Sequence, residues 1–327
     1  MRIAFVITRA ASVDETWTTV HLARAALDRG DTVRFIEPWD FEIDSMGRLL
    51  GRAHAFDMPV PDDQLAALLS QRRAPRRYVD LHRIDLMLLR AAPLDPSILT
   101  FAALVKENGV RVVNDPEGLL RVSHKAWLAT IPDLQTPPSV VTRSRASCQV
   151  FYGEHRDGVV VKPARGSGGR AVSRVYPGNP AALDQAFDRA RDVGDGYVVV
   201  QAYLPEAEEG EKRLVWLDGD VIGGYLRRRA PGEFRHNLKR GGLAEPTTIT
   251  DEDAALVRQI TPYLTQTGVR LAGLDVIGGN LIEVNTLNPG GAFHADRLTG
   301  SHLAELILAR LSQPLEAEKA KWAVPAP

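Results

Sequence analysis

The chain has almost no cysteine and almost no net charge. Cys148 is the only cysteine among the 327 residues, so neither an internal disulfide nor a metal site with two cysteine ligands can form. The 40 Lys and Arg residues nearly balance the 41 Asp and Glu residues, which leaves a formal net charge of −1. Because no overall field attracts polyanions or anionic lipids, we expect neither a nucleic acid nor a membrane as partner.

Long apolar runs and several well-known site motifs are also missing. The opening MRIAFVITRA is short and soon broken by charge, so we expect neither a signal peptide nor a membrane span, and we expect a cytoplasmic enzyme. No G-x-G-x-x-G follows this first apolar run, and the chain has no P-loop and no G-x-S-x-G sequence. His124, His236 and His294 lack the spacing of zinc ligands. These absences disfavour dinucleotide, P-loop, serine-hydrolase and zinc sites.

The hydrophobic pattern predicts an α/β protein that opens with a doubly wound parallel sheet. Residues 2–7 and 32–36 have the pattern of buried strands, and residues 18–29 between them have helical spacing. A second strand–helix–strand pattern covers residues 84–113. Residues 42–77 are charged and irregular, which predicts a flexible excursion. We therefore expect an α/β domain over residues 1–118.

The pattern changes after Asn114 and Pro116. We expect Lys125 on a helix and a frayed tail from residue 313 onward. The further expected elements are strands over residues 139–142, 158–162, 197–201, 211–217 and 221–229, and helices over residues 119–128, 181–191, 251–267 and 298–311.

The most informative stretch is LAGLDVIGGNLIEVNTLNPGG, residues 271–291. Gly278, Gly279 and Asn280 predict a tight turn between two strands. Because side chains alternate along a strand, the hairpin brings three oxygen-bearing side chains together. Two carboxylates and an amide suit Mg²⁺, which prefers water and phosphate oxygens as its remaining ligands. The alternative is a hairpin with a solvated polar face. The three side chains are Asp275, Glu283 and Asn285.

A glycine-rich loop, residues 166–169, follows an apolar strand pattern that ends in Lys162. Backbone amides of such a loop can approach phosphate oxygens closely, because glycine has no Cβ. A lysine at the end of a buried strand is costly unless it meets an anion. A plain glycine-rich hairpin is the alternative.

Basic residues concentrate in the second half of the chain, in and near the polar segment of residues 231–242. In a chain of nearly zero net charge, this concentration favours a small polyanion as ligand. The alternative for each arginine is a surface ion pair of little energetic value. The residues are Arg213, Arg227, Arg228, Arg229, Arg235, Lys239 and Arg240.

The order of motifs resembles the prokaryotic glutathione synthetase family of ATP-grasp ligases. An α/β domain is followed by VVVKP-x2-G-x-GG, QAYLP, E-x-R, R-x-NL-x2-GG and GLD-x7-E-x-N-x3-P. The resemblance covers residues 1 to about 312. It implies that a two-lobed ATP-grasp fold follows the N-terminal domain, with a small lobe over residues 119–204, a large lobe over residues 205–312 and a tail over residues 313–327.

The resemblance also implies roles for individual residues. It implies binding of ATP by Lys125, Lys162, Gly166, Ser167, Gly168, Gly169, Gln201, Ala202, Tyr203, Leu204 and Glu211. It implies catalytic roles for Arg213, beside the reacting carboxylate, and for Arg235, Asn237 and Gly242, in a mobile lid. It implies Mg²⁺, with Mn²⁺ as a substitute, on Asp275, Glu283 and Asn285. It implies contact with the substrates for Arg90, Asn288, Gly290 and Gly291.

The chain departs from the family pattern where the substrates are expected to bind. Ala91 and Ala92 stand where the family carries a charged pair after Arg90, and Gly290 and Gly291 change the end of the metal motif. We expect an ATP-dependent carbon–nitrogen ligase that joins a small carboxylate to an amine, with glutathione formation as the leading activity. The alternatives are another substrate pair, glutamylation of a protein tail, or an ATP-binding regulatory module. The resemblance also implies a homo-oligomer.

Overall fold

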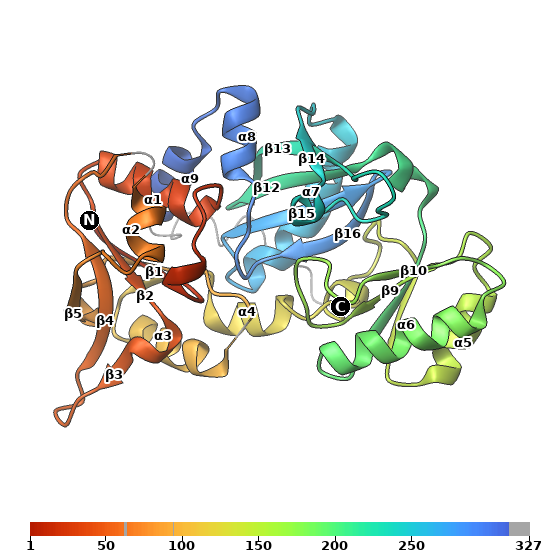
Figure 1. Cartoon of the computed structure of the whole chain (residues 1–327), viewed down its shortest axis with the longest axis horizontal. Helices are drawn as coiled ribbons and strands as arrows, with labels where there is room; N and C mark the ends of the chain where they lie inside the picture. The colour runs from red at the N-terminus through yellow and green to blue at the C-terminus, as the bar shows by residue number, and fades with distance from the viewer. Residues whose placement is uncertain (62–63, 94, 314–327) are drawn as a thin grey trace.

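A computed structural model describes residues 1–61, 64–93 and 95–313, which build three sheets (Figure 1). Each sheet falls within one of the three predicted units, although the boundaries at residues 118, 204 and 312 stay predictions. Residues 314–327 of the predicted tail lie outside the described residues. None of the described helices is long and apolar enough to cross a membrane.

The first sheet has the predicted parallel core. Its strands β1 (Arg2–Val6), β2 (Thr32–Ile36), β6 (Leu86–Leu89) and β7 (Arg111–Val113) run in the order β2-β1-β6-β7. Apolar residues of β1 alternate between two buried clusters, so helices cover both faces. These helices are α1 (Thr18–Asp28) and α3 (Pro96–Glu107), and short turns occur at η1 (Ala10–Ser12), η2 (Pro38–Asp40) and η3 (Leu81–Arg83).

The prediction of a flexible excursion over residues 42–77 is wrong. This segment contains most of β3 (Phe41–Ile43), all of β4 (Leu49–Phe56) and α2 (Leu65–Ser70), and the start of β5 (Arg76–Asp80), and β4 extends the sheet antiparallel to β2. Six of the eight residues of β4 are buried, but Arg52 of β4 and the first three residues of β5 are exposed, and Arg52 pairs with Tyr78. These exposed residues interrupt the apolar pattern, so the sequence looks like a loop.

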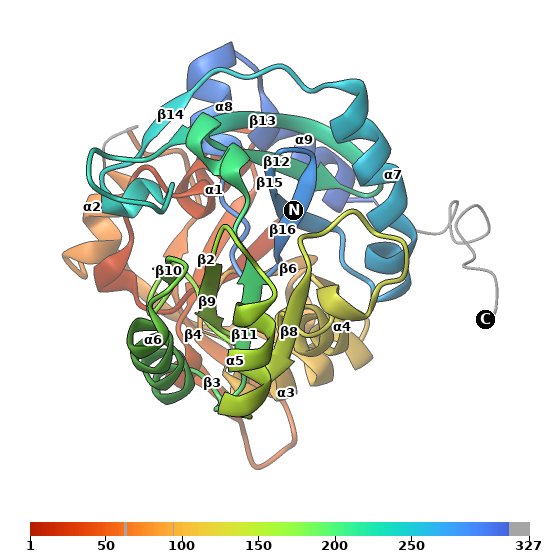
Figure 2. The same cartoon turned by 90° about the vertical axis from the view of Figure 1, so that its right-hand side faces the viewer.

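The second sheet has the strand order β10-β9-β11-β8 and is antiparallel. The strands are β8 (Ser139–Thr142), β9 (Val159–Pro163), β10 (Ser173–Val175) and β11 (Val198–Ala202). Figure 2 shows α5 (Arg145–Gly153) and α6 (Pro180–Val193) in front of this sheet; α5 has no counterpart in the sequence-based prediction. Because β9 alternates, Val159 and Val161 pack against these helices while Lys162 points to the opposite face.

Lys125 does not lie on a helix, contrary to prediction. Helix α4 (Pro116–Val122) ends before it, and η4 (Leu128–Thr130) follows. The backbone N–H of Lys125 donates instead to the carbonyl oxygen of Ala164, 3.1 Å away, beside the glycine-rich loop. The contact with this loop therefore decides the local backbone structure, although the spacing of the apolar residues favours a helix.

The third sheet has the order β14-β13-β12-β15-β16 and contains the predicted hairpin. Its strands are β12 (Glu211–Leu217), β13 (Asp220–Arg228), β14 (Leu243–Glu245), β15 (Leu271–Ile277) and β16 (Asn280–Asn285), and η5 (Pro205–Glu209) and η6 (Leu238–Arg240) lie in its connections. Helix α7 (Asp251–Gln266) covers one face, where Trp216 is fully buried. The opposite face of β12 and β15 therefore remains for a site.

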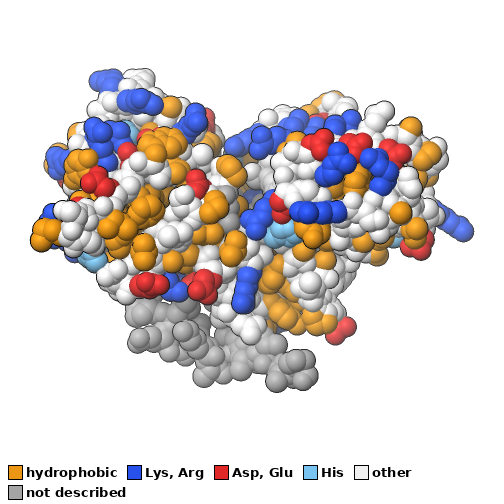
Figure 3. Space-filling view, turned by 90° about the horizontal axis from the view of Figure 1, so that it is seen from below, with side chains coloured by type: hydrophobic (Ala, Val, Ile, Leu, Met, Phe, Trp, Pro, Cys, Tyr) orange, Lys and Arg blue, Asp and Glu red, His pale blue; other side chains and the backbone are white. Residues whose placement is uncertain are grey.

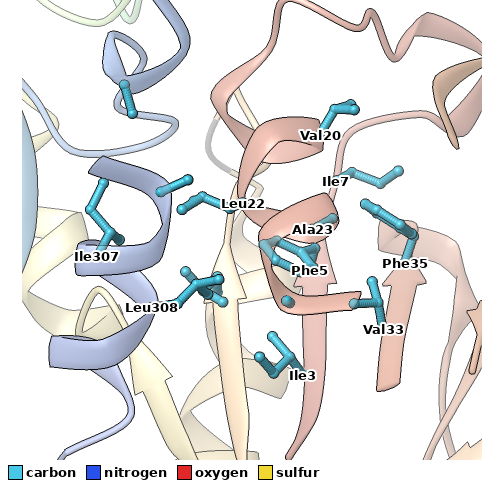
Figure 4. Packing of buried hydrophobic residues seen from close by; sticks show 14 of the residues in the cluster. Ile3, Phe5, Ile7, Val20, Leu22, Ala23, Val33, Phe35, Ile307 and Leu308 are labelled. Atoms are coloured by element: carbon cyan, nitrogen blue, oxygen red, sulfur yellow. The ribbon is translucent and has the colours of Figure 1, made fainter. Parts of the chain in front are cut away.

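The closing helix is two helices, α8 (Ala292–Thr299) and α9 (Leu303–Leu311), and not the single helix predicted over residues 298–311. Gly300 has φ +69°, a left-handed conformation that ends α8. The side chain of Asp296 then accepts the N–H of Leu303 at 2.8 Å. Figure 4 shows the result of this break: Ile307 and Leu308 of α9 lie beside Leu22 of α1.

Asn114 ties the end of the first sheet to the third sheet. Its buried side chain donates to the carbonyl oxygens of Leu271 (2.8 Å) and Thr286 (3.1 Å) and accepts the N–H groups of Arg270 and Leu271, both at 2.9 Å. All four partners are backbone groups of the third sheet and its connections, so this one side chain links the first domain to the third sheet.

We predict that Asn114→Ala lowers the free energy of unfolding by roughly 2–4 kcal/mol, because it leaves buried backbone groups unpaired. Asn108→Ala is the matched control, since the Asn108 side chain is exposed and makes one bond, to Leu104. Urea unfolding followed by circular dichroism compares the two. Equal, small effects in both variants would contradict the role of Asn114.

Candidate active site

All the predicted site residues line one cavity of about 1000 Å³. The cavity is bounded by the open faces of the second and third sheets and by residues of the first domain, among them Thr8, Trp17 and Arg90. The sequence-based selection therefore converges in space, which supports the individual roles; those roles stay predictions.

A buried ion cluster lies at the base of the cavity. Asp275 of β15 faces Arg213 of β12, its paired residue, and the Nη2 of Arg213 donates to Oδ2 of Asp275 at 2.9 Å. Arg227 of β13 approaches Oδ1 of the same carboxylate at 2.6 Å. Burial acts to raise the pKa of Asp275, but the two guanidinium groups outweigh it and hold the pKa at about 2. Asp275 is therefore an anion throughout the neutral range.

The other two predicted metal ligands lie beside Asp275. Glu283 of β16 is its cross-strand partner, and Asn285 donates its Nδ2 to Oδ2 of Asp275 at 3.0 Å, so the Oδ1 of Asn285 points away from that bond. The described residues contain no cluster of three His, Cys, Asp or Glu side chains. The protein would thus supply two carboxylates and one amide oxygen, a set of hard donors that fits a divalent cation with water and phosphate as further ligands.

Two lysines face these carboxylates: Lys162 lies on the second sheet, and Lys125 lies in the segment that leads to it. Lys125 Nζ lies 3.5 Å from Oε1 of Glu283 and donates to the carbonyl oxygen of Gly166 at 3.1 Å. Lys162 is almost fully buried and donates to Oε1 of Gln201 at 3.0 Å. Burial lowers the pKa of Lys162 to about 8, although Glu283 acts in the opposite direction. Both ammonium groups lie where a polyphosphate would bridge the sheets.

The glycine-rich loop and the predicted lid contact each other. Gly169 has φ +69°, and a Cβ there would lie 2.5 Å from Oδ1 of Asn237, so only glycine fits. Nη1 of Arg235 donates to the carbonyl oxygen of Gly169 at 2.9 Å. On the other side, Nζ of Lys239 lies 5.1 Å from the ring centroid of Trp17 in the first domain. The lid segment thus spans the cavity between two domains.

The predicted nucleotide hinge, residues 201–204, lies along one wall of the cavity. The ring of Tyr203 is covered by the guanidinium of Arg174 at 3.5 Å, and its hydroxyl donates to Glu208 at 2.9 Å. Glu211, the predicted ribose-binding acid, forms an ion pair with Arg227. Glu211 therefore also belongs to the buried ion cluster, a role that its position in the sequence does not indicate.

Arg90 is the most unusual group in the half of the cavity that adjoins the first domain. Its side chain is 3% exposed, and it donates to Oγ1 of Thr19 (3.1 Å) and to the carbonyl oxygen of Pro289 (3.0 Å). No described carboxylate pairs with it, and its Nη1 has no hydrogen-bond partner. Burial lowers the pKa of Arg90 to about 9. An unpaired buried cation beside a cavity is well placed for an anionic ligand group.

The predicted substrate residues surround the same region. Asn288 Oδ1 accepts from the hydroxyl of Thr19 at 3.3 Å, and the carbonyl oxygen of Gly290 accepts from Nη1 of Arg213 at 3.1 Å. Gly291 has φ +136°, and a Cβ there would lie 3.3 Å from Cγ of Arg213. These contacts connect the loop after the metal hairpin to both Arg90 and Arg213.

Some cavity residues were missed by the sequence-based prediction. They come from the segment before α1, the start of α1, β13 and the first turn of α8, and no local motif marks them. They are Asp14, Trp17, Thr18, Tyr225 and His294.

Comparison with known proteins agrees with this geometry. Residues 1–121 match the N-terminal domain, and residues 124–300 the ATP-grasp domain, of prokaryotic glutathione synthetase. The chain is 31% identical over 326 residues to the glutathione synthetase of Synechococcus elongatus, covering 95% of this chain and 98% of that protein. It is 35% identical over 212 residues to that of Escherichia coli K12, covering 63% and 66%.

The chain belongs to the prokaryotic glutathione synthetase family. This membership confirms the predicted fold class and an ATP-dependent carbon–nitrogen ligase that uses ATP and a divalent metal. Two solved structures share the ATP-grasp fold: D-cycloserine synthetase (TM-score 0.68, 16% identity, 95% and 98% coverage) and the VanG D-Ala:D-Ser ligase from Enterococcus faecalis (TM-score 0.65, 14% identity, 95% and 98% coverage).

We predict that nucleotide binding changes the protonation of Lys162. Above about pH 8 this buried amine is largely neutral in the free protein, and phosphate favours its charged form, so binding a non-hydrolysable ATP analogue takes up a fraction of a proton. Near pH 6.5 the amine is already charged, so no uptake is expected. Calorimetry in buffers of different ionisation enthalpy measures this uptake.

Lys162→Met should abolish the proton uptake and weaken binding by roughly ten- to a hundredfold, the value of a charge-assisted contact. Lys106→Met, which removes an exposed lysine paired with Asp115, serves as control. Unchanged affinity in Lys162→Met would remove Lys162 from the phosphate site.

Proposed function

We propose that this protein is an ADP-forming, Mg²⁺-dependent ligase of the glutathione synthetase type. It phosphorylates a small carboxylate with ATP and joins the resulting acyl phosphate to an amine. A γ-glutamyl dipeptide is the leading donor and glycine the leading acceptor. The proposal also includes a cytoplasmic enzyme and, as the family resemblance implies, a homo-oligomer.

The observation that carries this proposal is that three groups of charged side chains line one cavity. Lys125 and Lys162 face the place of a polyphosphate, Asp275 and Glu283 supply hard oxygen ligands, and Arg213 stands between the metal ligands and the substrate half. Binding of a nucleotide alone would not require the third element. This arrangement favours a ligase over a regulatory ATP-binding module.

The residues perform the chemistry by positioning and by neutralising charge. A carboxylate is a poor electrophile, and phosphorylation converts it into a mixed anhydride with phosphate as leaving group. When bound, Mg²⁺ would neutralise the oxygens of the transferring phosphoryl group. Arg213, already oriented by Asp275, holds the substrate carboxylate in line, and the lid formed by residues 231–242 keeps water from the acyl phosphate.

Arg90 supports a substrate that carries a second carboxylate. A peptide or amino acid brings one carboxylate to be activated and another that stays free, and the unpaired guanidinium of Arg90 matches the free group. Ala92 lines the cavity, whereas Ala91 is packed in the apolar core of the first domain. Of the two positions that carry charges in the family, only that of Ala92 therefore faces the substrate.

We predict a donor other than, or broader than, γ-glutamylcysteine. Phosphate release is measured with ATP, Mg²⁺, an amine and a panel of amino acids and γ-glutamyl dipeptides. We expect release to require both donor and amine, and at least one other donor to equal or exceed γ-glutamylcysteine in kcat/KM. Efficient turnover of γ-glutamylcysteine with glycine alone, at about 10⁴ M⁻¹ s⁻¹ or more, would contradict this donor prediction. Absence of release with every pair would contradict the ligase.

The variant Arg90→Gln is tested in the same assay. It should raise KM for the substrate with the free carboxylate by roughly ten- to a hundredfold and leave KM for ATP unchanged. Arg83→Gln, which changes an exposed arginine of the same domain, is the matched control. Equal losses with substrates that lack a second carboxylate would show that Arg90 acts only on the fold.

We predict that residues 231–242 are a mobile lid, ordered mainly when substrates are bound. The segment has few apolar contacts and three glycines, and its basic residues are trypsin sites. Trypsin should cut it in the free protein, and ATP plus substrate should suppress the cut. Trp17→Ala, which removes the ring under Lys239, should speed the cut without exposing other sites. Equal protection with and without ligands would count against a lid.

A further inference from the structure

Amide formation requires a proton acceptor for the incoming amine. An amino group is an ammonium ion at neutral pH and has no lone pair with which to attack the acyl phosphate. A side chain that removes this proton must lie in the cavity, must be unprotonated before the reaction, and must be free of strong bonds to other groups.

Most titratable side chains of the cavity do not meet these conditions. Asp275 and Glu211 are bound by arginines. Hydrogen bonds from Thr16 lower the pKa of Asp14, so it is a weak base. The Nε2 atom of His236 lies 2.9 Å from the carbonyl oxygen of Ala207, and this ring is almost fully buried. Glu283 faces Lys125 and belongs to the metal ligands.

His294 meets all three conditions. It lies in the first turn of α8, lines the cavity and is half-buried. Its ring contacts the rings of Tyr225 and Phe293, at 5.4 and 5.3 Å between centroids. Among the described residues, neither ring nitrogen of His294 has a hydrogen-bond partner. The two aromatic neighbours therefore fix the ring while leaving its nitrogens available.

His294 is connected to Arg213 through Tyr225. Tyr225 is the residue paired with Arg213 across β12 and β13. Gly291, one residue before α8 begins, approaches both of them, since a Cβ there would lie 3.3 Å from Arg213 and 3.4 Å from Tyr225. Arg213, Tyr225 and His294 thus form one continuous wall, with the carboxylate site at one end and the imidazole at the other.

The groups around His294 favour its neutral form. Burial, followed by the charge of Arg297 on the same helix, lowers the pKa of His294 below its usual value. Burial raises the pKa of Tyr225 on β13, so that neighbour is an uncharged phenol. On α1, His21 contacts Phe293 but is bound to Asp296. At neutral pH the imidazole is therefore a base.

We propose that His294 is the proton acceptor for the amine substrate, an inference that rests on the proposed function. The ammonium gives one proton to the imidazole, and its lone pair then forms the C–N bond. The bond from the acyl carbon to the phosphate oxygen breaks, and its electron pair leaves with phosphate. Phosphate takes the second nitrogen proton, and the imidazolium later releases the first proton to solvent.

Hydroxylamine separates this role from the rest of the reaction, because it is largely uncharged at neutral pH and needs no base. His294→Gln and the natural protein are compared with ATP, Mg²⁺ and the most active donor of the panel described above, with either glycine or hydroxylamine as acceptor. Amide formation with glycine should fall about a hundredfold or more in kcat, the usual value of general base catalysis. Hydroxamate formation should change by less than about threefold.

A matched control is His302→Gln, which makes the same change at an exposed histidine outside the cavity, 79% exposed and next to Glu305. It should leave both rates unchanged. The pH profile provides a second readout: without its base, His294→Gln should depend on free amine, so its rate with glycine rises steadily toward the pKa of the acceptor.

Three outcomes would overturn the inference. Equal losses with both acceptors would assign His294 to the fold or to the first step. A raised KM for glycine with unchanged kcat would make it a binding residue. A natural protein that forms no hydroxamate and releases no phosphate would overturn the proposed function and this inference with it, whereas the first two outcomes leave the ligase itself intact.

Discussion

One buried carboxylate organises the large lobe and its chemistry. Asp275 is held by Arg213 and Arg227 from two neighbouring strands, and Glu211 completes the charge balance around Arg227. Charges buried this deeply are costly unless they are paired, and removal of one partner from such a pair costs roughly 3–5 kcal/mol. The alignment of β12, β13 and β15 therefore depends on Asp275. The same pairing orients Arg213 before any substrate arrives.

The remaining cations of the cavity have less compensation. Lys162 and Arg90 are both nearly fully buried, and for both burial lowers the pKa, which means that the folded protein holds these charges at a cost. Each lies in a different half: Lys162 on the sheet of the small lobe and Arg90 at the end of β6. Anionic groups of two different ligands would relieve the two costs independently, as the proposed function requires of a nucleotide and a carboxylate substrate.

The sequence predicted which residues meet in the cavity better than it predicted the elements around it. The hairpin of Asp275 and Glu283 and the glycine loop are local signals, since turn residues and strand alternation place the side chains without reference to the rest of the chain. The strands in residues 41–80 were missed because exposed charged residues interrupt their apolar pattern, and the break at Gly300 was missed because apolar spacing continues across it. The burial of Arg90 depends on Pro289, 199 residues away, and no local pattern indicates such a contact.

Under the proposed function, the cavity has a half for ATP and a half for the substrates. The residues predicted to hold phosphate and metal are connected to one another within the second and third sheets. The first domain contacts the lid through Trp17 and Lys239, and it contacts the loop after the metal hairpin through Thr18 to Gly291 and Thr19 to Asn288. Substitutions in that loop or in the first domain therefore change what is joined while leaving the phosphates in place. Ala92 and Gly290 lie in this half, which explains how the chain departs from its family pattern there and keeps the full set of ATP and metal residues.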